Sequence, residues 1–386
     1  MTDHYVNKEP FNPQSAVTLT AAQEKYYLAS QWQLIWWKLK KHKLAYISLI
    51  FLVATYSSLL ISEVLNPYNP NQRHIDHLNM PPQQVHIIHD GQLMRPFVYG
   101  IESEFSWEIN SWKYSENTEI IQPIRFFCAS SDYEGSDYEF WGLIDGNFHL
   151  FCPAKNGQLF LLGTDRLGRD MLSRMGYGAR ISLTVGIIGI TISFIMGITI
   201  GGIAGYYGGV VDSIIQRIIE IIRSFPQLPL WMALSAALPV TWSPILVFFG
   251  LTLILGMLDW PGLARAVRSK LLSLREEDFA VAAELMGAKP KRIIMRHLMP
   301  SFMSHLIASA SLSIPGMILG ETALSFLGLG LRPPITSWGV LLNEVQNINE
   351  VVLHPWLIAP MISVILVVLA FNFLGDGLRD AADPYK

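Results

Sequence analysis

The residues most suggestive of a function lie between 278 and 300, where an alanine-rich segment, DFAVAAELMG, is followed by a basic one, AKPKRIIMRHLMP. Alanine favours a helix, and Gly287 is the residue type that commonly ends one. The turn Ala288–Pro290 then separates this helix from a second, basic helix. We expect a compact knob that docks into a groove on a soluble partner. The alternative is a solvated basic loop.

No pattern for nucleotide, metal or covalent chemistry accompanies this segment. The glycine-containing stretch 163–170, GTDRLGRD, lacks the Lys-Ser/Thr end of a phosphate-binding loop. The chain is therefore expected to bind no ATP and to catalyse no reaction. The ten histidines show no metal-ligand spacing, so no metal site is predicted. Four of them stand near one another, where solvated side chains are the main interpretation and a metal site the alternative: His74, His77, His86 and His89.

Glu321 is an ionisable residue in a long apolar run, or at its outer end. An acidic side chain at membrane depth indicates a functional site by default, because its burial in lipid is costly. Glu321 is therefore a candidate for lining a transport pathway. The alternative is a solvated carboxylate at the membrane interface.

The elements that must position these residues are membrane-spanning helices. Apolar residues make up 51% of the 386 residues and charged residues only 15%. A span needs about 20 mostly apolar residues. Six runs of this kind predict an all-α membrane protein: 44–62, 181–206, 214–239, 241–260, 302–327 and 354–375. The net charge of −3 offers no overall basic surface for nucleic acid.

Basic residues orient the spans, because cytoplasmic loops carry an excess of Lys and Arg. Four lysines between 38 and 43 precede the first span, and residues 261–301 hold eight basic and four acidic residues. With an even number of spans, both termini are predicted in the cytoplasm. Within the N-terminal segment 1–43, residues 21–43 predict an interfacial helix anchored by three tryptophans between 32 and 37. A simple linker is the alternative.

Small residues and prolines modify three of the spans. In the second span, glycines recur every four residues: Gly197, Gly201, Gly205 and Gly209. Small residues allow helices to approach closely, and packing within the chain is favoured over contact with another subunit. Pro226 and Pro229 interrupt the third span, and the fifth span carries Pro315 and Gly316. Because proline bends helices and frees backbone groups, such spans can line a cavity.

Residues 63–162 predict a small external domain inserted after the first span. From residue 64 onward this segment holds five basic and twelve acidic residues, and no run in it could cross a membrane. Asp90-Gly91, Asp145-Gly146 and Asn156-Gly157 each favour a two-residue β-hairpin turn. We therefore expect a domain rich in β-hairpins.

Cys128 and Cys152, the only two cysteines of the chain, both lie in this external segment. Disulfides persist outside the cytoplasm, so the two cysteines are predicted to be bonded to each other. The alternative is a pair of buried thiols.

The stretch 278–300 resembles the EAA loop of bacterial ABC-importer permeases. That pattern is EAA, three residues, G, nine residues, I, one residue, LP. Four residues match at this spacing, namely Ala282, Ala283, Gly287 and Pro300. Three depart from it, namely Val281, His297 and Met299. Three further segments resemble C-type dipeptide and oligopeptide permeases: GTDRLGRDMLSRMGYGARISL at 163–183, TALSFLGLGL at 322–331 and NFLGDGLRDAADP at 372–384.

The resemblance implies a six-helix permease in the bacterial cytoplasmic membrane, with residues 163–386 as the permease domain. It would form half of a pathway for peptides. The implied partners are a second, B-type permease, two ATPase subunits carrying ATP and Mg²⁺, an external substrate-binding protein, the peptide and the lipid bilayer. Nickel complexes, glutathione and peptide antibiotics stay open as ligands, and a self-contained transporter, a channel or an anchored sensor are the rival classes.

The same resemblance implies which residues couple the permease to an ATPase subunit. They are Phe279, Ala282, Ala283, Gly287, Arg292, His297 and Pro300. Ala282 and Ala283 are small, so a partner surface is expected to approach the helix closely at both positions.

Overall fold

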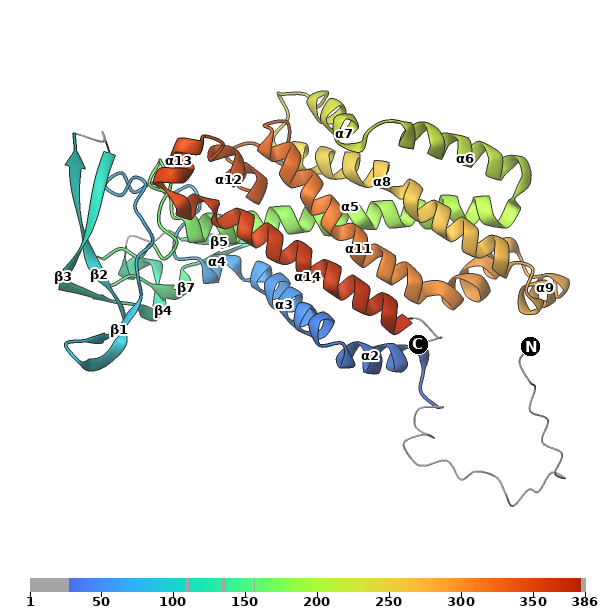
Figure 1. Ribbon diagram of the computed structural model, residues 1–386, viewed down its shortest axis with the longest axis horizontal. Helices are drawn as coiled ribbons and strands as arrows, with labels where there is room; N and C mark the ends of the chain where they lie inside the picture. The colour runs from blue at the N-terminus through green and yellow to red at the C-terminus, as the bar shows by residue number, and fades with distance from the viewer. Residues whose placement is uncertain (1–27, 108–110, 134–136, 156, 383–386) are drawn as a thin grey trace, which may run out of the picture.

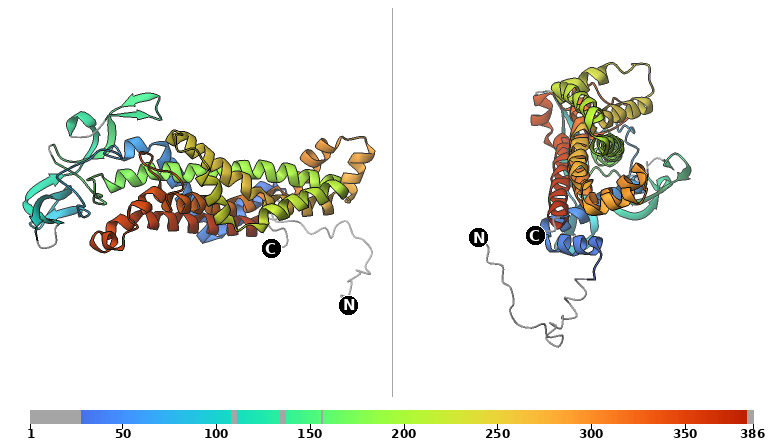
Figure 2. Two further views of the ribbon diagram at one scale, coloured as in Figure 1. Left: turned by 90° about the horizontal axis from the view of Figure 1, so that it is seen from above. Right: turned by 90° about the vertical axis from the view of Figure 1, so that its right-hand side faces the viewer.

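The computed structural model describes residues 28–107, 111–133, 137–155 and 157–382. Long helices form an elongated bundle with β-strands at one end and the short helix α9 at the other (Figures 1 and 2). We call these the strand end and the α9 end. Within the described residues, five helical segments are long and apolar enough to cross a membrane: Lys43–Leu60, Met171–Tyr207, Pro244–Leu274, Pro290–Phe326 and Pro355–Ala382.

The described chain enters the bundle through α2 (Gln31–Lys41) and the apolar helix α3 (Lys43–Leu60). A capping box starts α2: the Ser30 hydroxyl accepts from the Gln33 backbone N–H, and the Gln33 side chain accepts from the Ser30 N–H. The predicted interfacial helix thus begins at Gln31 within the described residues. Its first part, 21–27, lies outside them.

Helices α5 (Met171–Tyr207) and α8 (Pro244–Leu274) pack along each other. The glycine stripe of α5 faces α8, because a Cβ on Gly201 would collide with backbone atoms of Ala264. The predicted packing within the chain is therefore confirmed for Gly197, Gly201 and Gly205. It is wrong for Gly209, which begins α6 and where a Cβ would meet no heavy atom within 4 Å. Both helices exceed their predicted spans, and α8 continues helical through Pro261.

The predicted third span, 214–239, is two helices rather than one. Helix α6 (Gly209–Ser224) ends before Phe225, and α7 (Gln227–Ala236) begins after Pro226. Phe225 and Pro226 have extended backbone, with ψ of 139° and 130°, since proline disfavours helical geometry in the residue before it. Along the bundle, α6 and α7 follow one another in the direction opposite to α5 (Figure 1).

The chain then turns at the α9 end and returns to the strand end. Helix α9 (Asp278–Leu285) is followed by three segments without a helical break between them: α10 (Pro290–Arg292), the π-helical turn η3 (Ile293–Leu298) and α11 (Met299–Phe326). Pro315 lies inside α11, and the helix continues through it. Helical geometry is lost instead at Phe302, with φ −124° and ψ 16°.

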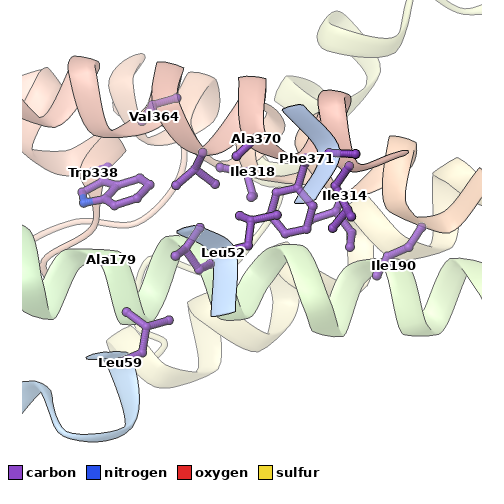
Figure 3. Close-up of a cluster of buried hydrophobic side chains, with 14 of the residues drawn as sticks. Leu52, Leu59, Ala179, Ile190, Ile314, Ile318, Trp338, Val364, Ala370 and Phe371 are labelled. Atoms are coloured by element: carbon purple, nitrogen blue, oxygen red, sulfur yellow. The ribbon is translucent and has the colours of Figure 1, made fainter. Parts of the chain in front are cut away.

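Three short elements at the strand end connect α11 to the last helix. They are α12 (Trp338–Glu344), α13 (Ile348–Leu353) and η4 (Pro355–Ile358), and α14 (Ala359–Ala382) follows. The largest apolar core joins α3, α5, α11, α12 and α14 (Figure 3). In it, Leu52 of α3, Ile318 of α11 and Phe371 of α14 belong to one cluster. Close packing of this kind holds helices together where lipid removes the usual hydrophobic driving force.

All strands of the described residues lie between His86 and Cys152. They form three antiparallel sheets: β1 (His86–His89), β2 (Gln92–Ser106) and β3 (Ser111–Pro123); β4 (Arg125–Ala129) with β7 (Phe148–Cys152); and β5 (Tyr138–Phe140) with β6 (Ile144–Gly146). Helix α4 (Ser62–Leu65) connects α3 to this segment.

One predicted hairpin turn is present and another is displaced. Asp90 and Gly91 join β1 to β2 with φ of 47° and 75°, as predicted. The turn predicted at Asp145-Gly146 is wrong, because both residues pair within β6. The positive φ values lie at Trp141 and Gly142, between β5 and β6. Asn156, of the third predicted turn, lies outside the described residues.

Candidate functional site

Helix α9 projects from the bundle at the α9 end (Figure 1). A Schellman motif closes it: the Ala288 N–H donates to the Ala283 carbonyl at 3.1 Å, and the Gly287 N–H donates to the Glu284 carbonyl at 2.8 Å. Gly287 has φ +80°, and a Cβ there would meet no heavy atom within 4 Å. Its backbone conformation alone therefore explains the glycine, as predicted.

Helix α9 has a buried face and an exposed face. Ala280 and Ala283 pack into a core with residues of α8, η3 and α11: Val267, Leu271, Ile293, Leu298, Met299, Phe302 and Leu306. Phe279 is partly exposed, whereas Leu285 and Met286 are 84% and 81% exposed. The expectation that a partner approaches Ala283 is wrong, because its small side chain serves the close packing of α9 on its own bundle. Ala282 lies on the exposed side.

The second half of the predicted knob is not a separate helix. Arg292 ends α10, His297 lies in η3 and Pro300 lies in the first turn of α11, all within one helical segment. Arg292 and Pro300 are exposed, and His297 is half-buried. Pro290 occupies the first turn of the segment, where a missing N–H costs little. Pro300 lies inside the segment, directly after the π-helical turn η3.

Glu321 is fully buried in α11, and its carboxylate is enclosed by hydroxyl groups. Oε2 accepts a hydrogen bond from Ser182 of α5 and Oε1 accepts one from Ser325, both at 2.8 Å. The Ser182 hydroxyl also accepts from the Trp338 N–H at 3.1 Å, so the group joins α5, α11 and α12. The interfacial alternative is wrong for this structure, because no part of Glu321 is exposed. A role in the pathway stays a prediction.

A polar cavity, which we call the break cavity, lies where α6 and α7 meet α8. It has a volume of about 290 Å³ and is lined by Ile222, Arg223, Phe225, Gln227, Leu230, Trp231, Leu258, Asp259, Pro261 and Gly262. Pro226 was the sequence signal for this break, but Arg223 and Asp259 were missed. The fourth span was predicted to end at 260, which placed Asp259 at its boundary instead of at the centre of α8.

Four charged side chains form a cluster at the strand end, of which Glu344 is half-buried and the other three are buried: Asp165, Arg169, Arg174 and Glu344. Arg174 Nη1 lies 2.6 Å from both Asp165 Oδ2 and Glu344 Oε2, and Arg169 Nε lies 2.7 Å from Asp165 Oδ2. Burial alone would raise the pKa of Glu344, but hydrogen bonds and charge from Arg174 and Arg169 hold it below its usual value. The cluster ties the start of α5 to α12.

A second buried pair ties α5 to the strand-bearing segment. Arg180 Nη1 donates to Glu63 Oε1 at 2.6 Å, and the Arg180 guanidinium lies 4.2 Å from the ring centroid of Trp141. The Trp141 N–H also donates to Glu63 Oε1, at 3.2 Å. Burial alone would raise the pKa of Glu63, but the hydrogen bonds from Arg180 hold it below its usual value.

The two cysteines lie on the paired strands β4 and β7. Pairing of Arg125 with Cys152 and of Cys128 with His149 brings the cysteine Cα atoms to 6.5 Å from each other. The structure joins them by a disulfide. Residues 24 apart in the chain are thereby linked within the strand-bearing segment.

Comparison with known proteins gives two family matches, one to the first helices of the bundle and one to the later helices. Residues 197–385 match the family described as "binding-protein-dependent transport system inner membrane component". Residues 30–82 match the "N-terminal TM domain of oligopeptide transport permease C". The structure also aligns with 97% of a chain of an inward-facing MetNI methionine ABC transporter, with a TM-score of 0.44 and 19% identity over 55% of this chain.

Similar curated proteins are peptide permeases. The oligopeptide transport system permease protein OppC of Haemophilus influenzae is 42% identical over 62% of this chain and 75% of that protein. The dipeptide permease DppC of Bacillus subtilis is 41% identical over 58% and 68%, respectively. DppC of Lactococcus lactis subsp. cremoris is 32% identical over 90% of this chain and 89% of that protein, so this alignment extends into residues 63–162.

The apolar helices and these matches define a multi-pass membrane permease. The chain belongs to the family of oligopeptide and dipeptide ABC transport permeases.

Proposed function

We propose that this chain forms one half of the transport pathway of an ATP-driven peptide importer, and that α9 couples it to an ATPase subunit. One observation carries the proposal. Helix α9 is anchored by buried Ala280 and Ala283, yet it presents Phe279, Leu285 and Met286 to solvent at the tip of the bundle. Exposed apolar side chains gathered beyond the spans favour a protein-binding surface.

In the proposed topology, α6 and α7 together supply a sixth crossing of the membrane. In the chain they lie between α5 and α8, and they run opposite to both (Figure 1). Six crossings put the two ends of the chain on the same side as α9. The excess of basic residues in 261–301 makes that side cytoplasmic. Residues 63–162 then form the external domain.

The proposed partners follow from this topology. A second, B-type permease supplies the other half of the pathway, and an external binding protein delivers the peptide at the strand end. Two ATPase subunits, which hold ATP and Mg²⁺, dock at the α9 end. Their closure on ATP moves α9 as a rigid body and opens the pathway outward; hydrolysis then resets it. This chain itself binds no nucleotide and catalyses no reaction.

The test replaces Leu285 by glutamate in the complete importer, with Leu143→Glu as the matched control. The two leucines are 84% and 85% exposed, but Leu143 lies at the strand end, between β5 and β6. A buried charge without a partner is costly. We therefore expect Leu285→Glu to weaken ATPase binding roughly tenfold or more, the scale of an interface hot spot. Leu143→Glu should retain the ATPase subunits.

The measurement is the recovery of ATPase subunits with the affinity-purified permease pair, together with ATP-driven peptide uptake. Normal ATPase recovery and normal uptake in Leu285→Glu would refute the docking role of α9. The segment 278–300 would then be a solvated basic loop.

A further inference from the structure

A charged residue lies at the centre of one of the long apolar helices. Asp259 is the central residue of the 31-residue helix α8, about 22 Å from each helix end at a rise of 1.5 Å per residue. A carboxyl group at such depth is costly in lipid and marks a functional site by default. Asp259 faces the break cavity.

The break cavity also holds a positive charge. Arg223, in the last turn of α6, lines it together with Asp259. No ion pair of the described residues joins these two side chains. The Asp259 carboxylate interacts electrostatically with Arg223 and also with the side chains of Gln227 and Ser193. Two opposite charges therefore line one cavity without forming an ion pair.

The break between α6 and α7 brings two helix ends to the same cavity. The end of α6 leaves its last carbonyl groups without helical donors, and the start of α7 leaves its first N–H groups without helical acceptors. Residues from both ends, Arg223 and Gln227, line the cavity. The carbonyl end of α6 carries a partial negative charge and the N–H end of α7 a partial positive charge. The helix ends thus add a second set of opposite charges to those of Asp259 and Arg223.

Trp231 adds a hydrogen-bond donor that has no acceptor among the described residues. Its indole is only 5% exposed, and among the described residues its Nε1–H has no hydrogen-bond partner. The Cζ3 and Cη2 edge of the ring packs against Gly320, which leaves the N–H on the opposite edge. Trp231 also lines the break cavity. A buried donor without a partner is rare in folded proteins, and a ligand in the cavity would supply the missing acceptor.

We propose that the break cavity binds the two free termini of a short peptide in transit. Asp259 receives the ammonium group, Arg223 the carboxylate, and the Trp231 N–H a main-chain carbonyl. This inference rests on the proposed function. A zwitterion matches both protein charges, whereas a ligand of a single charge leaves one of them unmatched. A site that binds only the termini and the main chain of a peptide accepts many different side chains. The cavity volume of about 290 Å³ is at the small end of the range for ligand pockets, which suits a short peptide.

The experiment measures peptide binding to the assembled permease–ATPase complex in nanodiscs, without the binding protein. Radiolabelled trialanine is displaced by unlabelled trialanine, by N-acetyl-trialanine and by trialanine amide. In the wild-type complex we expect each cap to weaken competition at least tenfold. Asp259→Asn should reduce discrimination against the N-acetyl peptide to within twofold and keep discrimination against the amide. Arg223→Gln should do the reverse.

Two further variants separate recognition from structure. Trp231→Phe keeps the ring and removes the N–H, so it should weaken all three peptides by a common factor. Arg217→Gln is the matched control: Arg217 lies on the same helix as Arg223, is 77% exposed, pairs with Glu220 and does not line the cavity. It should keep the wild-type pattern.

Several results would overturn the site. The first is a wild-type complex that fails to bind trialanine. The second is a wild-type complex that binds capped and free peptides equally well. The third is that Asp259→Asn and Arg223→Gln each weaken the binding of all three peptides by the same factor. Trialanine uptake into proteoliposomes, with the binding protein and ATP present, tests the proposed function separately. Uptake by a complex without terminus discrimination would reject the site and leave the importer function standing.

Discussion

The strand end of the bundle and helix α9 at the opposite end are held in place by different forces. At the strand end, buried charges join α5 to its neighbours, through Arg174 with Glu344 and through Arg180 with Glu63. At the α9 end, Ala280 and Ala283 hold α9 by apolar packing against η3 and α11. Charge-assisted hydrogen bonds prescribe both distance and direction, whereas apolar attraction is non-directional.

This difference suits a permease that moves at one end. At the strand end, a shift that moves α12 away from the start of α5 separates Glu344 from both Arg174 and Arg169. The Glu344 carboxylate is then left unpaired, which costs on the order of 3–5 kcal/mol. At the α9 end, packed apolar surfaces can slide by small steps without exposing an unpaired polar group. We therefore expect the strand end to act as the frame and the α9 end to carry the motion of the transport cycle.

The largest expected effect comes from removing the more deeply buried of the two arginines that link both acids of the strand-end cluster. Arg174→Met removes one contact from Asp165 and one from Glu344, and only Arg169 is left to balance the two carboxylates. We expect a loss of about 3–5 kcal/mol in the free energy of unfolding, measured by denaturant titration in detergent micelles. Arg217→Met is the control, because its ion pair with Glu220 is exposed and is worth about 0–1 kcal/mol. Equal losses in the two variants would contradict a rigid strand end.

The disulfide is expected to have the next largest effect, confined to the strand-bearing segment. Cys128→Ser opens a loop closed over 24 residues, worth roughly 3 kcal/mol in the chain-entropy model. Recovery of ATPase subunits should stay unchanged, since α9 lies at the other end of the bundle (Figure 1). The bond itself is checked by alkylation of the unfolded, unreduced protein. Labelling of both cysteines would show that it does not form.

A smaller, local effect is expected at the α9 end. Gly287→Val forces a β-branched residue into φ +80°, at a cost of about 1–2 kcal/mol. The open space around Gly287 means that backbone strain is the whole cost. We expect faster amide hydrogen exchange in α9 and reduced coupling of ATP hydrolysis to uptake, with normal pairing of the two permeases. Gly287→Asn should be milder, because asparagine tolerates positive φ. Wild-type exchange and coupling in the valine variant would refute this role of Gly287.

The smallest expected effect is a difference in pH response. The pKa values of Glu63 and Glu344 lie below their ordinary value of 4.5. Both carboxylates therefore contribute stability above pH 4.5 that is lost as the pH falls through their folded pKa values. We expect the apparent Tm in detergent to be insensitive to these groups near neutral pH and to drop below pH 4.5.

The control for this pH response is Glu344→Gln, which should show a shallower drop on the acid side. The apolar contacts of α9 hold no titrating group in their core and should not contribute. An acid response in Glu344→Gln equal to that of the parent protein would remove Glu344 from the explanation.

Local signals in the sequence determined the positions of most elements. Apolar runs predicted α3 and α11 to within three residues at each end, because a span is defined by its own composition. Gly287 and Pro226 act on their own backbone, so a helix end and a helix break were readable from residue type. The resemblance of 163–183, 322–331 and 372–384 to peptide permeases likewise needed no structure.

Tertiary structure alone decided which side chains meet. Ser182 reaches Glu321 across 139 residues, and Arg174 reaches Glu344 across 170. The cost of a buried charge depends on partners that helix packing brings together, and a local pattern does not encode them. Likewise, the packing of α9 turned Ala283 inward. The continuation of α8 through Pro261 placed Asp259 at mid-helix beside the break between α6 and α7.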